Sequence, residues 1–165
     1  MSQLFFPAIE QKPLEEIAAY QDHRLREALN YAWQNSPFYR NLFSLNHIDV
    51  DRIRSVSDLK RIPVTNKEDL QKYNRDFLCV PADRIIDYIT TSGTLGDPVT
   101  FAMTDKDLDR LAYNEAISFT CAGGSASDIY QLMTTIDRRF MAGLAYFLGI
   151  RMLGASVVRV GNGIP

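Results

Sequence analysis

The uneven distribution of glycine is the feature that most constrains how this sequence can fold. All nine glycines of the 165-residue chain lie between Gly93 and Gly163. Glycine provides the positive backbone angles and close approaches that tight turns between strands require. The sequence therefore predicts two regions, a helical N-terminal segment over residues 1–84 and a turn-rich α/β segment over residues 85–165.

The first region carries the periodicity of amphipathic helices. Between Leu14 and Trp33, apolar residues recur mostly at three- and four-residue steps, and Pro13 stands at the start of the run, as is common for a helix. Ser36-Pro37 ends this helix, because proline restricts the residue before it. A shorter helix is expected over residues 37–43.

A third helix is expected from a capping pattern. Thr65 and Glu68 in "TNKE" have the three-residue spacing at which two side chains bond each other's backbone N–H groups. The pattern predicts a helix that continues to about Tyr73.

The second region alternates strand-like and helix-like stretches. Thr104 and Asp107 form a capping pattern for a helix that Gly123-Gly124 ends. The expected strands cover residues 84–90, 99–104, 128–135 and 156–160, with a further helix over 140–153. Strands that alternate with helices favour parallel crossovers. We therefore predict an α/β fold, in which the helical segment is followed by the start of a mixed, largely parallel sheet with flanking helices.

Charge and composition exclude several classes of protein. A net charge of −2 and a pI near 5.7 disfavour a nucleic-acid binder, whose phosphate contacts need clustered lysine and arginine. Two isolated cysteines and two histidines offer no zinc-ligand spacing. The N-terminus lacks a secretory signal pattern, which predicts a cytoplasmic protein. The most apolar stretch, residues 140–150, is too short to cross a membrane.

The loop between the first two expected strands has two interpretations. "ITTSGTLGDPV", from Ile89 to Val99, can form a hairpin turn with Gly93 and Gly96 at its positive-φ positions. Its four hydroxyl side chains exceed what a turn needs, and glycines among hydroxyls suit a polyphosphate. The pattern is not GxxxxGK[ST], because no lysine follows Gly96. Residue types alone leave both interpretations open.

Longer motifs add a family resemblance. "TTSGTLGDPV" resembles the phosphate loop of adenylate-forming enzymes. "SPFYR", "DLKRIPVTNKEDL" and "FMAGLAYFLGIRMLGASVV" are similar to segments of the phenylacetate-CoA ligase family within that superfamily. The resemblance covers nearly the whole chain, and it implies part of the large domain of an adenylate-forming enzyme.

The resemblance implies a two-step ligase reaction. A small-molecule carboxylic acid attacks the α-phosphate of Mg-ATP, giving an acyl adenylate and pyrophosphate, and the thiol of coenzyme A then displaces AMP. ATP, Mg²⁺ and coenzyme A are therefore the implied cofactors. Members of the family tend to dimerise, which makes a homodimer the implied assembly.

The same resemblance assigns site residues. The nucleotide phosphates would be contacted by Ser92, Gly93, Thr94 and Gly96, with Thr91 beside them. Phe140 matches a residue that lines the acid pocket, although an ordinary core phenylalanine is the alternative. No catalytic residue and no protein ligand of a metal is assigned.

Three departures from the family pattern affect that site. Leu95 and Asp97 stand where most members of the superfamily have threonine and lysine, and Asp97 adds negative charge beside the phosphates. "IDRR" replaces a tyrosine- and glycine-rich stretch, so an arylacetate substrate is not assured. Arg138 and Arg139 in that stretch either meet a carboxylate or phosphate or are solvated.

The chain also lacks motifs that the family places later in the sequence. Its last lysine is Lys106, whereas these enzymes carry a catalytic lysine in a mobile C-terminal domain. We therefore expect an N-terminal piece of a larger enzyme, inactive by itself. The alternatives are an adenylating ligase of the same family for another acid or cofactor, and a non-catalytic module that binds nucleotide or pairs through its unfinished sheet.

Overall fold

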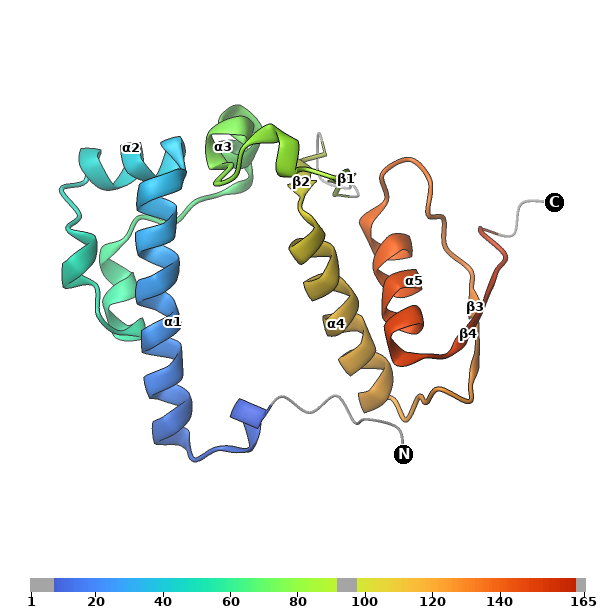
Figure 1. The fold of residues 1–165 in the computed structure, drawn as a ribbon. Coiled ribbons are helices and arrows are strands. Elements are labelled where there is room, and N and C mark those ends of the chain that lie inside the picture. The colour runs from blue at the N-terminus through green and yellow to red at the C-terminus, as the bar shows by residue number, and fades with distance from the viewer. Residues whose placement is uncertain (1–7, 92–97, 163–165) are drawn as a thin grey trace. The chain divides into compact units, whose positions relative to one another are not determined.

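The fold is known from a computed structural model that describes residues 8–91 and 98–162 (Figure 1). The chain divides into two compact units, of which the first ends at Ala82 and the second begins at Asp83. In these described ranges, no helix has both the length and the apolar character that crossing a membrane would require.

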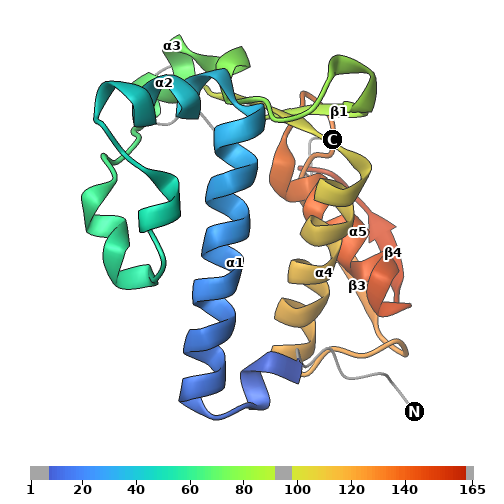
Figure 2. The same cartoon turned by 60° about the vertical axis from the view of Figure 1, so that its left-hand side comes forward.

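The first unit is built on one long helix. Helix α1 spans Leu14–Asn35, and α2, Pro37–Leu45, crosses its C-terminal end (Figure 2). Both helices confirm the prediction from apolar periodicity. Short 3-10 turns and one further helix complete the unit: η1 Ala8–Gln11, η2 Val50–Arg52, η3 Val56–Arg61, α3 Lys67–Lys72 and η4 Asn74–Phe77.

The "SPFYR" motif serves packing in this unit. Ser36 is fully buried, and its hydroxyl donates a 2.8 Å hydrogen bond to the carbonyl of Asp76 while accepting from the Tyr39 N–H at 3.3 Å. Phe38 stacks on Phe77 with ring centroids 3.9 Å apart. Ser36 thus caps α2 and fastens the α1–α2 junction to η4, which gives this motif a structural explanation.

The start of α3 differs from the prediction by one residue. Asn66, not Thr65, caps the helix and accepts a 2.9 Å hydrogen bond from the Asp69 N–H, while Asp69 accepts from the Asn66 N–H at 3.0 Å. The capping pair is therefore Asn66 and Asp69 rather than Thr65 and Glu68. Asparagine outranks threonine as an N-cap, which explains the choice between neighbouring candidates.

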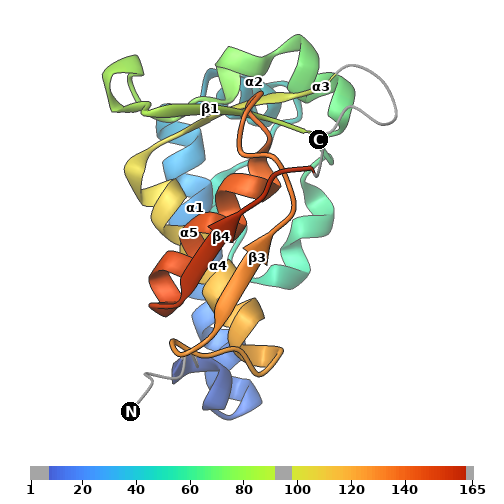
Figure 3. The same cartoon turned by 90° about the vertical axis from the view of Figure 1, so that its right-hand side faces the viewer.

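In its described residues, 83–91 and 98–162, the second unit has four strands in two pairs. The short 3-10 turn η5, Ala82–Arg84, leads into strand β1, Asp87–Thr90, which pairs antiparallel with β2, Thr100–Met103. Strand β3, Ile129–Leu132, pairs parallel with β4, Ser156–Arg159. Helix α4, Asp105–Cys121, follows β2, and α5, Met141–Leu153, connects the parallel pair and lies behind it in Figure 3. The predicted α/β fold class with a parallel crossover is confirmed.

Helices α4 and α5 pack closely because small residues face each other. Ala112 and Ala116 on α4 are buried, and a Cβ atom on Gly149 of α5 would overlap the side chain of Glu115. Small side chains at such a crossing let two backbones approach. Gly154 then ends α5 in the left-handed conformation, with φ of 82°.

The capping box of α4 links stability to pH. Asp107 accepts hydrogen bonds from the Thr104 N–H at 3.0 Å and from the Thr104 hydroxyl at 2.7 Å. Partial burial acts to raise the pKa of Asp107, but these hydrogen bonds, with Arg110 nearby, outweigh burial and hold the pKa below its ordinary value of 3.8. Because the folded pKa is the lower one, this stabilisation is complete above the ordinary value and is lost as pH falls through the folded pKa.

We expect Asp107→Asn to remove part of this pH dependence. Melting temperatures followed by circular dichroism should show wild type above the variant at neutral pH, with the gap narrowing as the pH falls below the ordinary pKa of 3.8. Asp109→Asn, an exposed position on the same helix, is the control. Parallel curves for wild type and Asp107→Asn would contradict the assignment.

Candidate functional site

The β1–β2 hairpin holds the base of the predicted phosphate loop. The Thr91 N–H donates to the Val99 carbonyl at 3.0 Å, and the Thr91 hydroxyl accepts from the Val99 N–H at 3.0 Å. Thr91 therefore closes the loop, and its hydroxyl keeps a hydrogen to donate. The other predicted phosphate contacts, Ser92, Gly93, Thr94 and Gly96, lie outside the described residues. Leu95 and Asp97 also lie outside them.

The end of β1 also meets the start of α5. The Thr90 N–H donates to the Arg139 carbonyl at 2.9 Å, and Thr90 forms a parallel bridge with Phe140, the N-cap residue of α5. Phe140 is half-buried. The structure thus brings the predicted acid-pocket residue beside the base of the predicted phosphate loop, although the two are about fifty residues apart in sequence.

Gly143 permits this arrangement. A Cβ atom on Gly143 would overlap the carbonyl oxygen of Thr135, so the segment leading to Phe140 passes directly against the first turn of α5. Sequence reasoning gave Gly143 no role of its own. The available signal was a glycine in the first turn of an otherwise regular helix, which points to close backbone approach when a packing reason exists.

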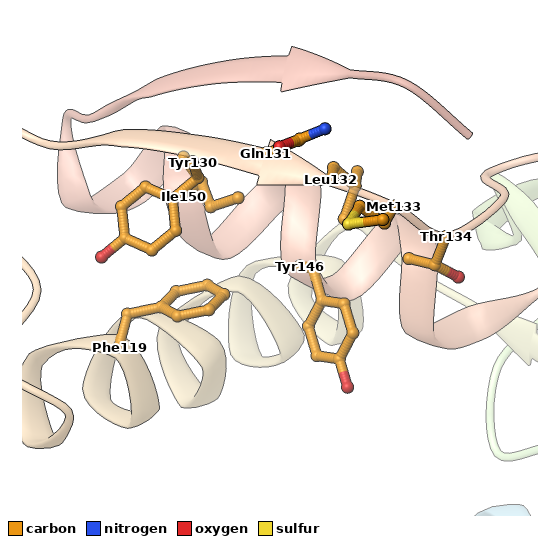
Figure 4. Close-up of a pocket in the computed structure, with 8 residues that line it drawn as sticks. All are labelled: Phe119, Tyr130, Gln131, Leu132, Met133, Thr134, Tyr146 and Ile150. Carbon is orange, nitrogen blue, oxygen red and sulfur yellow. The ribbon is translucent and has the colours of Figure 1, made fainter. Parts of the chain in front are cut away.

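A separate apolar cavity of about 340 Å³ opens beside β3 (Figure 4). The ring of Phe119 on α4 lies 5.0 Å from that of Tyr130 and 6.2 Å from that of Tyr146. Burial, and then the nearby Asp128, raise the pKa of the Tyr130 phenol, so it stays protonated at neutral pH and can donate a hydrogen bond. The lining residues are Phe119, Tyr130, Gln131, Leu132, Met133, Thr134, Tyr146 and Ile150.

This cavity could not be anticipated from the sequence. Its three rings come from α4, β3 and α5, and each by itself is indistinguishable from a core aromatic. Phe140 is not among its lining residues. Such a cavity can hold an apolar group and offers few polar atoms for reaction chemistry.

No group of three or more histidine, cysteine, aspartate or glutamate side chains that could hold a metal occurs within residues 8–91 and 98–162. Cys79 is half-buried and Cys121 exposed, and both are free thiols. Burial raises the pKa of Cys79, which keeps it in the unreactive thiol form.

Comparison with known proteins finds curated relatives of this chain. No family model matches the sequence. Phenylacetate-coenzyme A ligase of Escherichia coli K12 is 34% identical over 156 residues, which cover 94% of this chain and 36% of that protein. The Thermus thermophilus protein of the same name is 32% identical over 162 residues, covering 98% of this chain and 36% of its own length. The chain thus spans about a third of the relatives it matches.

Solved structures show the same relationship. A crystal structure of 2-hydroxyisobutyryl-CoA ligase with 2-HIB-AMP and CoA in the thioesterification state superposes with a TM-score of 0.87 at 28% identity, covering 97% of this chain and 35% of that one. The same ligase in the postadenylation state with 2-HIB-AMP gives 0.83 at 26% identity, covering 93% and 33%. Nearly the whole of this chain is therefore similar to about one third of the length of the phenylacetate-coenzyme A ligases, the family that its sequence motifs resemble.

Proposed function

We propose that this chain is part of an ATP-dependent acid–thiol ligase. The enzyme would activate a small carboxylic acid as an acyl adenylate and then transfer the acyl group to coenzyme A. The observation that carries the proposal is the backbone connection between Thr90 and the Arg139–Phe140 segment, which joins a loop suited to phosphate and a residue suited to the acid. The relatives' names and the ligands in the neighbouring structures support the same chemistry.

Each part of the site has a physical task in this proposal. The loop would neutralise and orient the β- and γ-phosphates, so that pyrophosphate leaves opposite the attacking carboxylate oxygen. Thr91 fixes the base of that loop through Val99. Phe140 would position the carboxylic acid beside the phosphate loop. Mg²⁺ would enter as the ion that accompanies ATP.

The exposed apolar face of the β3–β4 pair supports the proposal that further chain covers it in a longer polypeptide. Parallel sheets are usually covered on both faces, yet Ile129 is 74% exposed and Val158 is 52% exposed.

In this proposal residues 1–84 are a scaffold, and residues 85–165 carry the nucleotide loop. Because the chain spans about a third of the related ligases, we expect it to lack ligase activity by itself. A homodimer stays a prediction that analytical ultracentrifugation can test.

Acid-dependent exchange of pyrophosphate into ATP tests the proposal. The longer protein that contains this chain should catalyse exchange with one acid from a panel of arylacetates and short hydroxy acids. Ser92→Ala and Thr94→Ala should each lower the exchange rate about 10- to 100-fold, because a hydrogen bond to a charged group contributes about 1.5–3 kcal/mol.

Ser118→Ala is the matched control. Ser118 lies on α4 and bonds its own helix through the Asn114 carbonyl, so its loss should leave exchange unchanged. Exchange that survives both loop substitutions would rule out the loop as the phosphate site. Nucleotide binding without exchange for any acid would favour the non-catalytic module instead.

A further inference from the structure

The turn that precedes α5 has an unusual backbone. Arg138 and Arg139 have φ angles of 55° and 62°, the left-handed conformation that glycine adopts without cost. Non-glycine residues held in that region store strain and persist where the surrounding structure fixes them, often at functional sites. Two consecutive arginines in this conformation therefore need an explanation.

The turn is fixed against the hairpin. The Arg139 carbonyl accepts from the Thr90 N–H at 2.9 Å and from the Thr90 hydroxyl at 3.5 Å. On the other side, the Phe140 N–H donates to the Asp137 carbonyl at 3.1 Å. The backbone of this turn is therefore held by hydrogen bonds to Thr90, the residue before Thr91, where the loop begins.

Both guanidinium groups are also available to a ligand. Their side chains are exposed, and in the described part of the chain neither makes an ion pair or a side-chain hydrogen bond. Two of the other four arginines of this unit are engaged: Arg110 lies 3.6 Å from Asp107, and Arg159 stacks over the ring of Phe147. Asp137 is the acidic residue next to the pair in sequence.

The charge of the loop supplies the reason for such a pair. The loop sequence contains Asp97 and no lysine or arginine, although a triphosphate needs positive charge to offset its own. Arginine matches phosphate oxygens with a rigid fork of N–H donors. The first turn of α5, which follows directly, contains no acidic residue to oppose an anion.

We propose that Arg138 and Arg139 form a cationic turn that binds the nucleotide phosphates and replaces the positive charge missing from the loop. This inference rests on the proposed function and names residues for it. The strained backbone is then the cost of placing two guanidinium groups where a glycine-like turn is required. Stability and phosphate affinity should consequently change in opposite directions when the arginines are removed.

Binding of tripolyphosphate to the 165-residue chain, measured by titration calorimetry at low ionic strength, tests the inference. The double substitution Arg138→Gly and Arg139→Gly should weaken binding at least about tenfold, since charge-assisted hydrogen bonds are lost. The same variant should melt about 4 °C higher or more, because glycine relieves the strained angles. Arg138→Lys with Arg139→Lys should keep part of the affinity, since charge is retained.

Arg75→Ala, which removes one positive charge from an exposed position on η4, is the control for loss of charge away from the turn. Equal affinity of wild type and the glycine variant would overturn the inference, and so would the absence of tripolyphosphate binding by wild type. Neither result touches the proposed function, which depends on exchange and on Ser92 and Thr94. If the variant of the longer protein raises the KM of the acid and not of ATP, the arginines bind the carboxylate and the inference is wrong.

Discussion

Replacing Gly143 with alanine is expected to lower the free energy of unfolding of the second unit by about 3 kcal/mol, the upper end of the usual cost of overpacking. Alanine should stabilise a helix interior by about 1 kcal/mol relative to glycine, so propensity alone predicts the opposite sign. The new methyl group would overlap the Thr135 carbonyl oxygen. A backbone atom cannot move aside as a flexible side chain can, so the overlap should dominate.

The substitution should also disturb the candidate site. To relieve the overlap, the segment between Thr135 and Phe140 must shift, and the hydrogen bonds between Thr90 and the Arg139 carbonyl should lengthen or break. We expect the longer protein carrying Gly143→Ala to lose pyrophosphate exchange together with stability. This would identify Gly143 as a positioning residue that touches neither substrate.

Chemical denaturation separates this effect from a general one. The single tryptophan, Trp33, lies in the first unit, so its fluorescence should follow that unit, while far-UV circular dichroism follows both. Gly143→Ala should shift the unfolding transition of the second unit, seen by circular dichroism, and leave the fluorescence transition of the first unit unchanged. Gly123→Ala is the control, because a Cβ atom there meets nothing within 4 Å, so the only cost to alanine is the backbone φ of 88°. Equal stability of Gly143→Ala and wild type would contradict the packing.

Phe43→Ala is expected to have a comparable effect on the first unit, about 3–5 kcal/mol. Phe43 is fully buried, and its ring lies 6.2 Å from Trp33 on α1 and 5.8 Å from Tyr39 on α2. Truncation would remove these contacts and leave a cavity that two anchored helices cannot close. The loss should appear in the Trp33 fluorescence transition, because Phe43 stacks on that ring.

Leu45→Ala provides the comparison within the same helix. Leu45 is 80% exposed, so its truncation should change the free energy of unfolding by less than about 0.5 kcal/mol. If both substitutions have similar small effects, Phe43 does not anchor the α1–α2 junction. If Leu45→Ala is the more damaging of the two, that surface is covered in solution.

Local patterns in the sequence account for most of the secondary structure. Periodicity gave α1, and the Thr104–Asp107 capping box gave the start of α4, because each depends on residues within one or two helical turns. The strands on both sides of the loop and the parallel crossover through α5 were also predicted. The error at α3 arose where two adjacent capping pairs competed.

By itself, the sequence determined the order of helices and strands, the hydroxyl-rich loop between two strands, and the resemblance to a ligase family. Only the tertiary structure decided that Thr90 bonds the Arg139–Phe140 segment, that Gly143 lies against Thr135, and that three rings from separate elements line one cavity. The physical reason is the range of the interactions. Caps and amphipathic faces depend on neighbours within a few residues, whereas these contacts join positions that become neighbours only after the chain has folded.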